Sequence, residues 1–435
     1  MLSLLLATLP GLARAPAQDE AASTLALLRT PEHALQLAGA NAADRARFML
    51  PLLRTYAELL GWKLMLEPEL EAELAQLETG LYLPAEIARA DVHPLVQSLA
   101  RARGLCFRLD SVAGQALLRV EHDRSAQTSA APISIPPELL PAWSNHPAFL
   151  LCVEIAHPSE GSEELCRRLR ALLAQCASRA DVVRMESGAL RLTASAAILE
   201  FVAEALREGS WRAQGLEAAT FPPDPNTPEG KAAAVLPPNL RTVFPQQDGP
   251  LVLHEDDSQP SELAIAEAYG RWAARPLLFL TGETRAALAP NPGAADTPKS
   301  VPPAWVHEFV SGGLADAGCA LAPLPAEHPV LWTIEKHPQG KAVGLDPGGI
   351  PTIRLADLAA VAHLAATRFQ AFVRLPKLDA EQLRGIGELQ SPDVRAPFWI
   401  TQLDDPQVFS VIGTPRAITS AVLGLKLILT QTKAR

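Results

Sequence analysis

The stretch that decides the fold is Tyr56-Ala57-Glu58-Leu59-Leu60-Gly61-Trp62-Lys63-Leu64-Met65-Leu66. Its pattern is typical of a helix end, a glycine turn and an apolar strand. The same layout returns in the second half of the chain, at Tyr269-Gly270-Arg271-Trp272-Ala273-Ala274-Arg275-Pro276-Leu277-Leu278-Phe279. A composite pattern that recurs at a long offset indicates an internal repeat.

Four further matches keep nearly the same offset. They are Ala100–Gly104 with Leu314–Gly318, Leu117–Glu121 with Leu331–Glu335, then, at a slightly longer offset, Phe149, Val153 and Ile155 with Phe369, Val373 and Leu375, and Ala197, Ile198 and Val202 with Ala417, Ile418 and Val422. Because one order of elements is kept across all these segments, the sequence predicts duplication of an ancestral pair of small domains.

Periodicity and turn residues predict the elements of the first copy. They are helices at 47–60, 91–103, 137–144, 162–176 and 195–207, and strands at 62–66, 81–87, 106–110, 117–121, 149–156, 181–185 and 189–193. Gly104 is expected to end its helix in the left-handed conformation. This order favours an α+β fold of four small two-layer domains, each a mixed sheet with two helices, arranged as a duplicated pair.

Proline-rich breaks set the expected domain boundaries. The predicted parts are a signal peptide at 1–17, domains of a first and a second type at 18–124 and 133–210, a linker at 211–249, and a second copy of the two types at 250–338 and 350–435. The linker holds seven prolines with little apolar periodicity, which favours an extended tether.

The N-terminus has the pattern of an export signal. An apolar run from Leu2 to Leu12 is followed by Ala15-Pro16-Ala17, a small-x-small cleavage pattern, so the mature chain is expected to begin at Gln18. No later segment reaches the roughly 18 apolar residues that a membrane span needs. The sequence therefore predicts a mature chain without a transmembrane span, in the periplasm or secreted.

Charge and cysteine content argue against several classes of protein. The 38 basic and 48 acidic residues give a net charge of −10, without a basic and aromatic cluster, which speaks against a nucleic-acid partner. Five cysteines, at 106, 152, 166, 176 and 319, are odd in number and lack CxxC spacing, so neither a zinc site nor a disulfide framework is indicated. We expect most of them to be core thiols.

The sequence holds none of the common catalytic motifs and offers four weak candidates. They are His254-Glu255-Asp256-Asp257 as metal ligands, the pair His307-Glu308, Cys319 near Asp316, and the turn Asp346-Pro347-Gly348-Gly349 as a phosphate cradle. The first set is better explained as acidic residues that favour a helix N-terminus, since a metal needs three or four converging ligands, and the others lack a second ligand, a base or a strand-to-helix junction. The sequence therefore predicts no catalytic, cofactor or metal residues, and a protein that is not an enzyme.

Both predicted domain types resemble domains of a known family. The first domain, with Leu60-Gly61-Trp62-Lys63-Leu64-Met65-Leu66 and Arg103-Gly104-Leu105-Cys106-Phe107-Arg108-Leu109, resembles the first N-terminal domain of secretins, itself related to a short domain of TonB-dependent receptors. The second, with Phe409-Ser410-Val411-Ile412-Gly413-Thr414-Pro415-Arg416-Ala417-Ile418, is similar to the second secretin N-domain. The resemblance implies a periplasmic scaffold that packs into rings or docks a secretion-system partner. The secretin barrel has no counterpart before Arg435, so channel formation is not implied.

Two functional classes follow. The first is a non-catalytic envelope protein that acts through a protein partner or self-association, at most peripheral to the membrane. The second is a monomeric module with a cleft for a peptide or glycan across the tether; an unrecognised enzyme ranks third. In the first class, unpaired sheet edges and helix faces are the expected contact surfaces.

Overall fold

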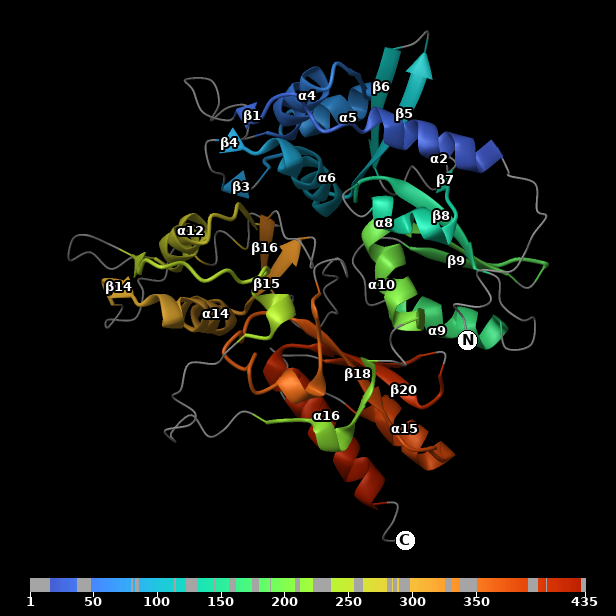
Figure 1. Ribbon diagram of the computed structural model, residues 1–435, viewed down its shortest axis with the longest axis vertical. Coiled ribbons are helices and arrows are strands. Elements are labelled where there is room, and N and C mark those ends of the chain that lie inside the picture. The colour runs from blue at the N-terminus through green and yellow to red at the C-terminus, as the bar shows by residue number, and fades with distance from the viewer. Residues whose placement is uncertain are drawn as a thin grey trace. The chain divides into compact units, whose positions relative to one another are not determined.

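The computed structural model describes residues 16–36, 48–79, 81–82, 86–112, 115–122, 132–143, 146–155, 162–173, 180–187, 189–207, 212–221, 236–253, 261–279, 284, 288, 298–324, 331–336, 350–389, 398–403 and 405–431. The chain divides into two compact units. Unit 1 comprises residues 1–79 and 85–208, and unit 2 comprises 80–84 and 209–435. In Figure 1, unit 1 runs from blue to green and most of unit 2 from yellow-green to red.

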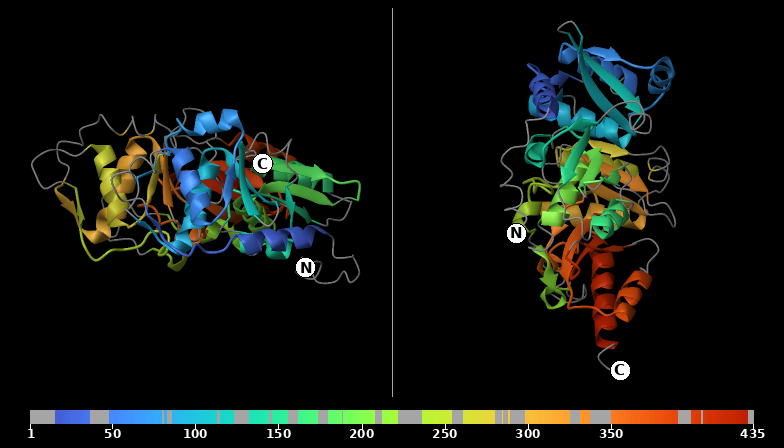
Figure 2. Two further views of the ribbon diagram at one scale, coloured as in Figure 1. Left: turned by 90° about the horizontal axis from the view of Figure 1, so that it is seen from above. Right: turned by 90° about the vertical axis from the view of Figure 1, so that its right-hand side faces the viewer.

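The first domain of unit 1 is a small mixed sheet packed against helices. Its elements are α2 (Pro16–Leu27), β1 (Leu35–Gln36), α4 (Met49–Leu59), β2 (Lys63–Met65), α5 (Pro68–Leu74), β4 (Glu86–Ile87), α6 (Val92–Ala102), β5 (Leu105–Val112) and β6 (Gln115–His122). The sheet order is β2-β6-β5, with β2 parallel to β6 and β5 antiparallel to it. Helix α4 buries Leu52, Leu53 and Tyr56, whose spacing places them on one face. The long β5–β6 pair stands beside these helices in Figure 2.

The second domain of unit 1 has four strands. Its elements are β7 (Ile133–Ser134), α8 (Leu140–Trp143), β8 (Leu150–Ile155), α9 (Ser162–Leu173), β9 (Asp181–Arg184), β10 (Leu190–Ser195) and α10 (Ala196–Arg207). The order is β7-β8-β10-β9, in which β10 is antiparallel to both of its neighbours. Apolar residues of β8 and β10, such as Leu151 and Leu192, are buried in it.

Unit 2 contains the same two kinds of sheet. The elements of the first are β12 (Leu251–Val252), α12 (Glu262–Trp272), β13 (Leu277–Phe279), β14 (Ser300–Val301), α14 (Val306–Asp316), β15 (Cys319–Leu324) and β16 (Leu331–Lys336), with β3 (Leu81–Tyr82) added at its edge. The sheet order is β15-β16-β13-β3, and β13 is parallel to β16 as β2 is to β6. The small ladder β12–β14 corresponds to β1–β4.

The second sheet of unit 2 is built around β18. Its elements are β11 (Gln214–Gly215), β17 (Thr352–Ile353), β18 (Phe369–Arg374), α15 (Ala380–Glu388), β19 (Trp399–Gln402), β20 (Val408–Gly413) and α16 (Pro415–Gln431). Both β11 and β17 lie parallel to β18, and β20 joins β18 to β19. Helices α15 and α16 lie side by side in Figure 1.

The predicted fold class is confirmed: the chain is α+β, with several small mixed sheets and helices packed on them. Apart from the strand expected at 81–87, the strands and helices predicted for the first half of the chain match the described elements to within a few residues. Gly104 follows α6 with φ of +70°, as predicted, and Gly318 follows α14 in the same way with φ of +71°.

Two features of the first 124 residues differ from the sequence expectations. Helix α5 has no counterpart among the predicted elements, although Pro68 at its first turn and the acidic residues Glu69 and Glu71 are helix-start signals. The stretch expected as one strand at 81–87 contains two separate strands, β3 in unit 2 and β4 in unit 1. These two strands pair with different partners, since β3 joins β13 while β4 joins β1.

The expected tether also differs. Within 211–249, the described residues form β11 and two short 3-10 helices at Leu216–Ala218 and Pro238–Leu240. Leu240, Val243 and Phe244 are buried in the core of unit 2. These residues, at positions i, i+3 and i+4, lie on one side of a helical turn. The prolines on either side of them are the reason that the sequence pattern predicts an extended segment instead.

The signal peptide stays a prediction. Residues 1–15 lie outside the described residues. Pro16 and Ala17, the end of the expected signal, form the first turn of α2, and Ala21 of that helix is fully buried.

One turn offers a test of the repeated layout. Gly61 follows α4 with φ of +68°, and Ala274, at the matching place after α12, has φ of +51°. Since a side chain makes the left-handed conformation costly, we expect Ala274→Gly to raise the free energy of unfolding by about 1 kcal/mol. Ala273→Gly, at a buried position with φ of −78°, is the matched control and should lower it. Chemical denaturation measures both, and a loss of stability in Ala274→Gly would contradict the argument.

Candidate interaction surfaces

A buried tyrosine and histidine are joined in the same way in each unit. In unit 1, the Tyr56 hydroxyl lies 2.6 Å from His93 Nδ1, and His93 Nε2 lies 2.6 Å from the carbonyl oxygen of Arg29. In unit 2, the Tyr269 hydroxyl lies 2.7 Å from His307 Nδ1, and His307 Nε2 lies 3.2 Å from the Pro245 carbonyl. We call each set a Tyr–His clamp. It ties α4 to α6 in unit 1 and α12 to α14 in unit 2, and in each unit it also binds a backbone carbonyl that precedes both helices.

The clamp fixes the state of its histidine. A carbonyl oxygen only accepts hydrogen bonds, so Nε2 carries the proton and Nδ1 accepts from the tyrosine. Burial lowers the pKa of His93, and it lowers the pKa of His307 to about 4. Burial also raises the pKa of both tyrosines. The clamps are therefore neutral hydrogen-bonded groups at pH 7, with a structural role.

Removing the hydroxyls tests the clamps. Tyr269→Phe leaves His307 Nδ1 without its donor, and we expect it to lower the free energy of unfolding by about 1–2 kcal/mol. Tyr56→Phe should lower it further, because the Tyr56 hydroxyl also accepts a hydrogen bond from Gln97 Nε2 at 3.0 Å. Urea denaturation followed by tryptophan fluorescence measures both. Equal, negligible losses would contradict this role.

The two domains of each unit meet through one repeated backbone hydrogen bond. Phe107 N donates to the Ala148 carbonyl at 2.8 Å in unit 1, and Leu321 N donates to the Ala366 carbonyl at 3.1 Å in unit 2. Each bond accompanies a parallel bridge between the end of one sheet and the start of the other. The repeated bond therefore joins the two domains of a unit in the same orientation locally.

In unit 1 this junction is lined by aromatic and imidazole rings. The His93 and His146 rings lie 5.5 Å apart, and His146 packs edge-on against Trp143 and Phe149. Gln97 Nε2 contacts His146 Nδ1 at 3.3 Å. Burial, with the adjacent His93, lowers the pKa of His146 to about 3.

In unit 2 the corresponding junction holds buried charges. Ser311 Oγ accepts a hydrogen bond from Ala366 N at 2.8 Å. Arg368 is 3% exposed and its guanidinium lies 5.2 Å from the centre of the Trp399 ring. Burial raises the pKa of Glu335 to about 7, which the charge of Arg368 opposes, and burial lowers the pKa of Arg368 to about 10. Glu335 and Arg368 come from different domains, so their attraction acts across the junction.

The outer edges of matching strands are used differently. Among the described residues, β2 pairs with β6 alone, and its Met65 is 38% exposed. Its counterpart β13 pairs with β16 on one side and antiparallel with β3 on the other, with Leu277 opposite Tyr82 and Leu278 opposite Leu81. Leu277 and Leu278 are both fully buried. The two sheets thus show the same edge with and without an added strand.

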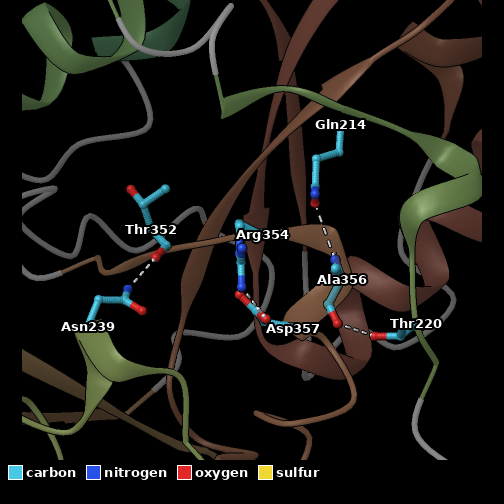
Figure 3. A network of polar contacts seen from close by, with 7 residues as sticks. All are labelled: Gln214, Thr220, Asn239, Thr352, Arg354, Ala356 and Asp357. Atoms are coloured by element: carbon cyan, nitrogen blue, oxygen red, sulfur yellow. Dashed lines mark hydrogen bonds and ion pairs between the residues drawn. The ribbon is translucent and has the colours of Figure 1, made fainter.

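A second added strand extends the β18 sheet. Gln214 and Gly215 of β11 pair with Val373 and Arg374, beyond the part of β18 that β17 covers. Figure 3 shows the polar contacts that hold this segment: the Gln214 side chain accepts from Ala356 N at 3.2 Å, and the Thr220 hydroxyl donates to the Ala356 carbonyl. The start of the segment expected as a tether is therefore built into the β18 sheet of unit 2 as an added strand.

A third hydrogen bond in the same network involves Asn239, which lies later in the segment expected as a tether. Asn239 Nδ2 donates to the Thr352 carbonyl at 3.2 Å, next to the Arg354–Asp357 ion pair of 2.8 Å (Figure 3). These contacts are made mostly to backbone atoms. Such atoms carry no side-chain signature, which is why no sequence pattern indicates them.

The structure describes some of the weak chemical candidates and not others. His254–Asp257 and Asp346–Gly349 lie outside the described residues, as does Cys176. His307 belongs to the clamp, while Glu308 is exposed. Cys319 is fully buried and lies 4.0 Å from the Ala317 carbonyl.

The described cysteines are free thiols in buried positions: Cys106, Cys152, Cys166 and Cys319. Within the described ranges, no group of three His, Cys, Asp or Glu side chains is placed to hold a metal ion. In the same ranges, no helix combines the length and apolar character that a membrane crossing requires.

No protein family model matches the chain, and no curated protein matches it. Three solved structures are similar at low identity. The first is the Klebsiella pneumoniae type II secretion system outer membrane complex of PulD, PulS and the PulC HR domain, at 11% identity and a TM-score of 0.30 over 90% of this chain. This chain covers 50% of the length of that solved chain.

The other two are shorter matches. The enterotoxigenic Escherichia coli GspC–GspD complex aligns at 11% identity and a TM-score of 0.16, over 40% of this chain and 94% of that one. The N-terminal domain of the secretin XcpQ from Pseudomonas aeruginosa, as an S210C dimer mutant, aligns at 14% identity and a TM-score of 0.14, over 43% and 73%. TM-scores this low carry no argument about the function of this chain.

Proposed function

We propose that this chain is a non-catalytic cell-envelope protein that mediates protein–protein assembly or docking, as a secretin-like component of a secretion or pilus system. Added strands carry this proposal most directly. In unit 2, the edges of two different sheets accept a segment from elsewhere in the chain, β3 on β13 and β11 on β18. A sheet edge that binds one extended segment through its backbone groups can bind another extended segment in its place.

We further propose that the chain arose by duplication of a pair of domains, in line with the repeated sequence. The Tyr–His clamp and the junction hydrogen bond support this. Each occurs in both units, between residues at nearly the same offset, such as Tyr56 and Tyr269 or the donors Phe107 and Leu321. Two copies of one pair would present similar edges in tandem, which suits a scaffold better than a single catalytic centre.

Cell fractionation with cross-linking tests location and assembly together. The full chain, produced in a Gram-negative host, should be released by osmotic shock. Formaldehyde treatment before lysis should trap it at multiples of its 46.5 kDa mass or with a discrete partner. A chain that stays in the cytosolic fraction and is trapped only at its own mass would overturn the proposal. A released chain that stays at its own mass would favour a monomeric peptide- or glycan-binding module instead.

A further inference from the structure

Strand β3 pairs with β13, a strand that is distant from it in the sequence. The chain before it is held in unit 1, where Arg103 Nη2 donates to the Thr79 carbonyl at 2.7 Å. The chain after it returns to unit 1, where Ile87 pairs with Leu35 of β1. Between these two points, residues 80–84 belong to unit 2. The segment that carries β3 is therefore part of unit 2, although the chain on both sides of it is part of unit 1.

The edge of β13 that pairs with β3 binds it through backbone hydrogen bonds. Strand β3 lies antiparallel to β13 over two residue pairs, and the β13 residues Leu277 and Leu278 are fully buried in the sheet. Backbone pairing of this kind depends on register and direction, which any other copy of the same strand can supply. A pairing of two residues is also short enough to open without unfolding either unit.

We propose that β13 is a docking edge for strand β3 of a second copy of this chain, so that copies join by exchanging this strand. The inference rests on the proposed assembly function and names the contact that would produce it. Each exchange replaces one pairing by an identical one, which keeps its energetic cost low. Reciprocal exchange between two copies closes as a two-fold dimer, whereas one-way donation repeats head-to-tail from copy to copy and closes into a ring where the geometry allows.

Complementary single-cysteine variants test the exchange. Leu81 and Leu278 face each other in the register, and Cα atoms of facing antiparallel residues lie within disulfide range. Leu81→Cys carrying an added tag is mixed with untagged Leu278→Cys at high concentration and oxidised. We expect a covalent heterodimer on a non-reducing gel that disappears on reduction. This product forms only between copies, because neither chain holds both new cysteines.

Matched controls give each outcome one meaning. Leu81→Cys mixed with Val252→Cys, whose residue is 53% exposed in β12, reports random thiol contact. Wild-type chain reports the native thiols. Heterodimer no stronger than in these controls would overturn the inference, provided that the double variant Leu81→Cys/Leu278→Cys forms a bridge within one chain. If the wild type still assembles in that case, the proposed function survives and only this contact fails.

A backbone variant provides a second, independent readout. Leu81→Pro combined with Tyr82→Pro removes both N–H donors of β3, while Leu81→Ala combined with Tyr82→Ala keeps them. We expect the proline variant to lose the self-association of the wild type and the alanine variant to retain most of it. Assembly that is unchanged in the proline variant would contradict strand exchange.

Discussion

Replacing Arg368 by methionine should lower the free energy of unfolding by about 1–2 kcal/mol at pH 8, because it removes the counter-charge of the Glu335 carboxyl, and each pH unit above a native pKa of about 7 is worth about 1.4 kcal/mol. Arg368 is 3% exposed, and Glu335 Oε2 makes no hydrogen bond to described residues. The variant also loses the contact with the Trp399 ring. The damage should concentrate at the junction between the two domains of unit 2.

The size of this loss should depend on pH. The pKa of Glu335 is raised to about 7 by burial, against the charge of Arg368. Below pH 7 the carboxyl of the variant is neutral and needs no partner, so the destabilisation should shrink at pH 6. Glu335→Gln in the Arg368→Met background is the matched control, and we expect it to restore part of the stability at pH 8. A loss that is the same at both pH values, without rescue, would contradict a charge pair across the junction.

Acidification from pH 7 to pH 5 should weaken unit 1 more than unit 2. Burial lowers the pKa of His93, and it lowers that of His146 to about 3. A histidine with a lowered pKa contributes stability that is complete above the unfolded value of about 6.5 and is lost as the pH falls toward the folded value. For His146 this loss amounts to about 2 kcal/mol at pH 5.

Unit 2 has an opposing group. His307 and His363 also have lowered pKa values because of burial, and they destabilise this unit in acid. The raised pKa of Glu335 acts the other way, because its folded form binds a proton between pH 7 and pH 4.5 before the unfolded form does. The two effects partly cancel in unit 2, whereas the described residues of unit 1 show no comparably raised carboxyl.

Hydrogen exchange followed by mass spectrometry resolves the two units in the intact chain. After correction for the intrinsic exchange rate, peptides from α4 and α6 should lose more protection between pH 7 and pH 5 than peptides from α12 and α14. His146→Asn keeps an acceptor for Gln97 but does not titrate, so it should reduce the loss in unit 1. Equal losses in both units, unchanged in the variant, would show that these histidines do not control acid stability.

Local pattern predicts much of the secondary structure. Helices such as α6 and strands such as β5 and β6 are visible in the sequence as periodic apolar runs between glycine turns. The pattern fails where chain segments pair over long distances. Nothing in the residues around Leu81 shows that β3 joins β13 of unit 2, because backbone pairing uses no particular side chain.

The clamps show what the sequence could have revealed. Tyr56 and Tyr269 belong to the repeated stretch, and His93 and His307 are related by nearly the same offset. The dipeptide His307-Glu308, considered by itself, suggests at most a metal ligand. The signal that sequence reasoning missed is the pairing of a tyrosine with a histidine at nearly the same spacing in both units.

The buried charge pair has no such signal. Glu335 and Arg368 occur together once, so no repeat could have indicated them. At the offset that relates Phe149 to Phe369, unit 1 has Ala148 where unit 2 has Arg368. Only the folded arrangement of the two domains brings this carboxylate and this guanidinium to one junction.

The most direct test of the assembly proposal is light scattering coupled to size exclusion on residues 16–435, which keep α2 intact, over a wide range of concentration. The account predicts a monomer at low concentration that converts to a defined higher oligomer as concentration rises. A strict monomer at every concentration would contradict self-association, and with it the exchange of β3 between copies.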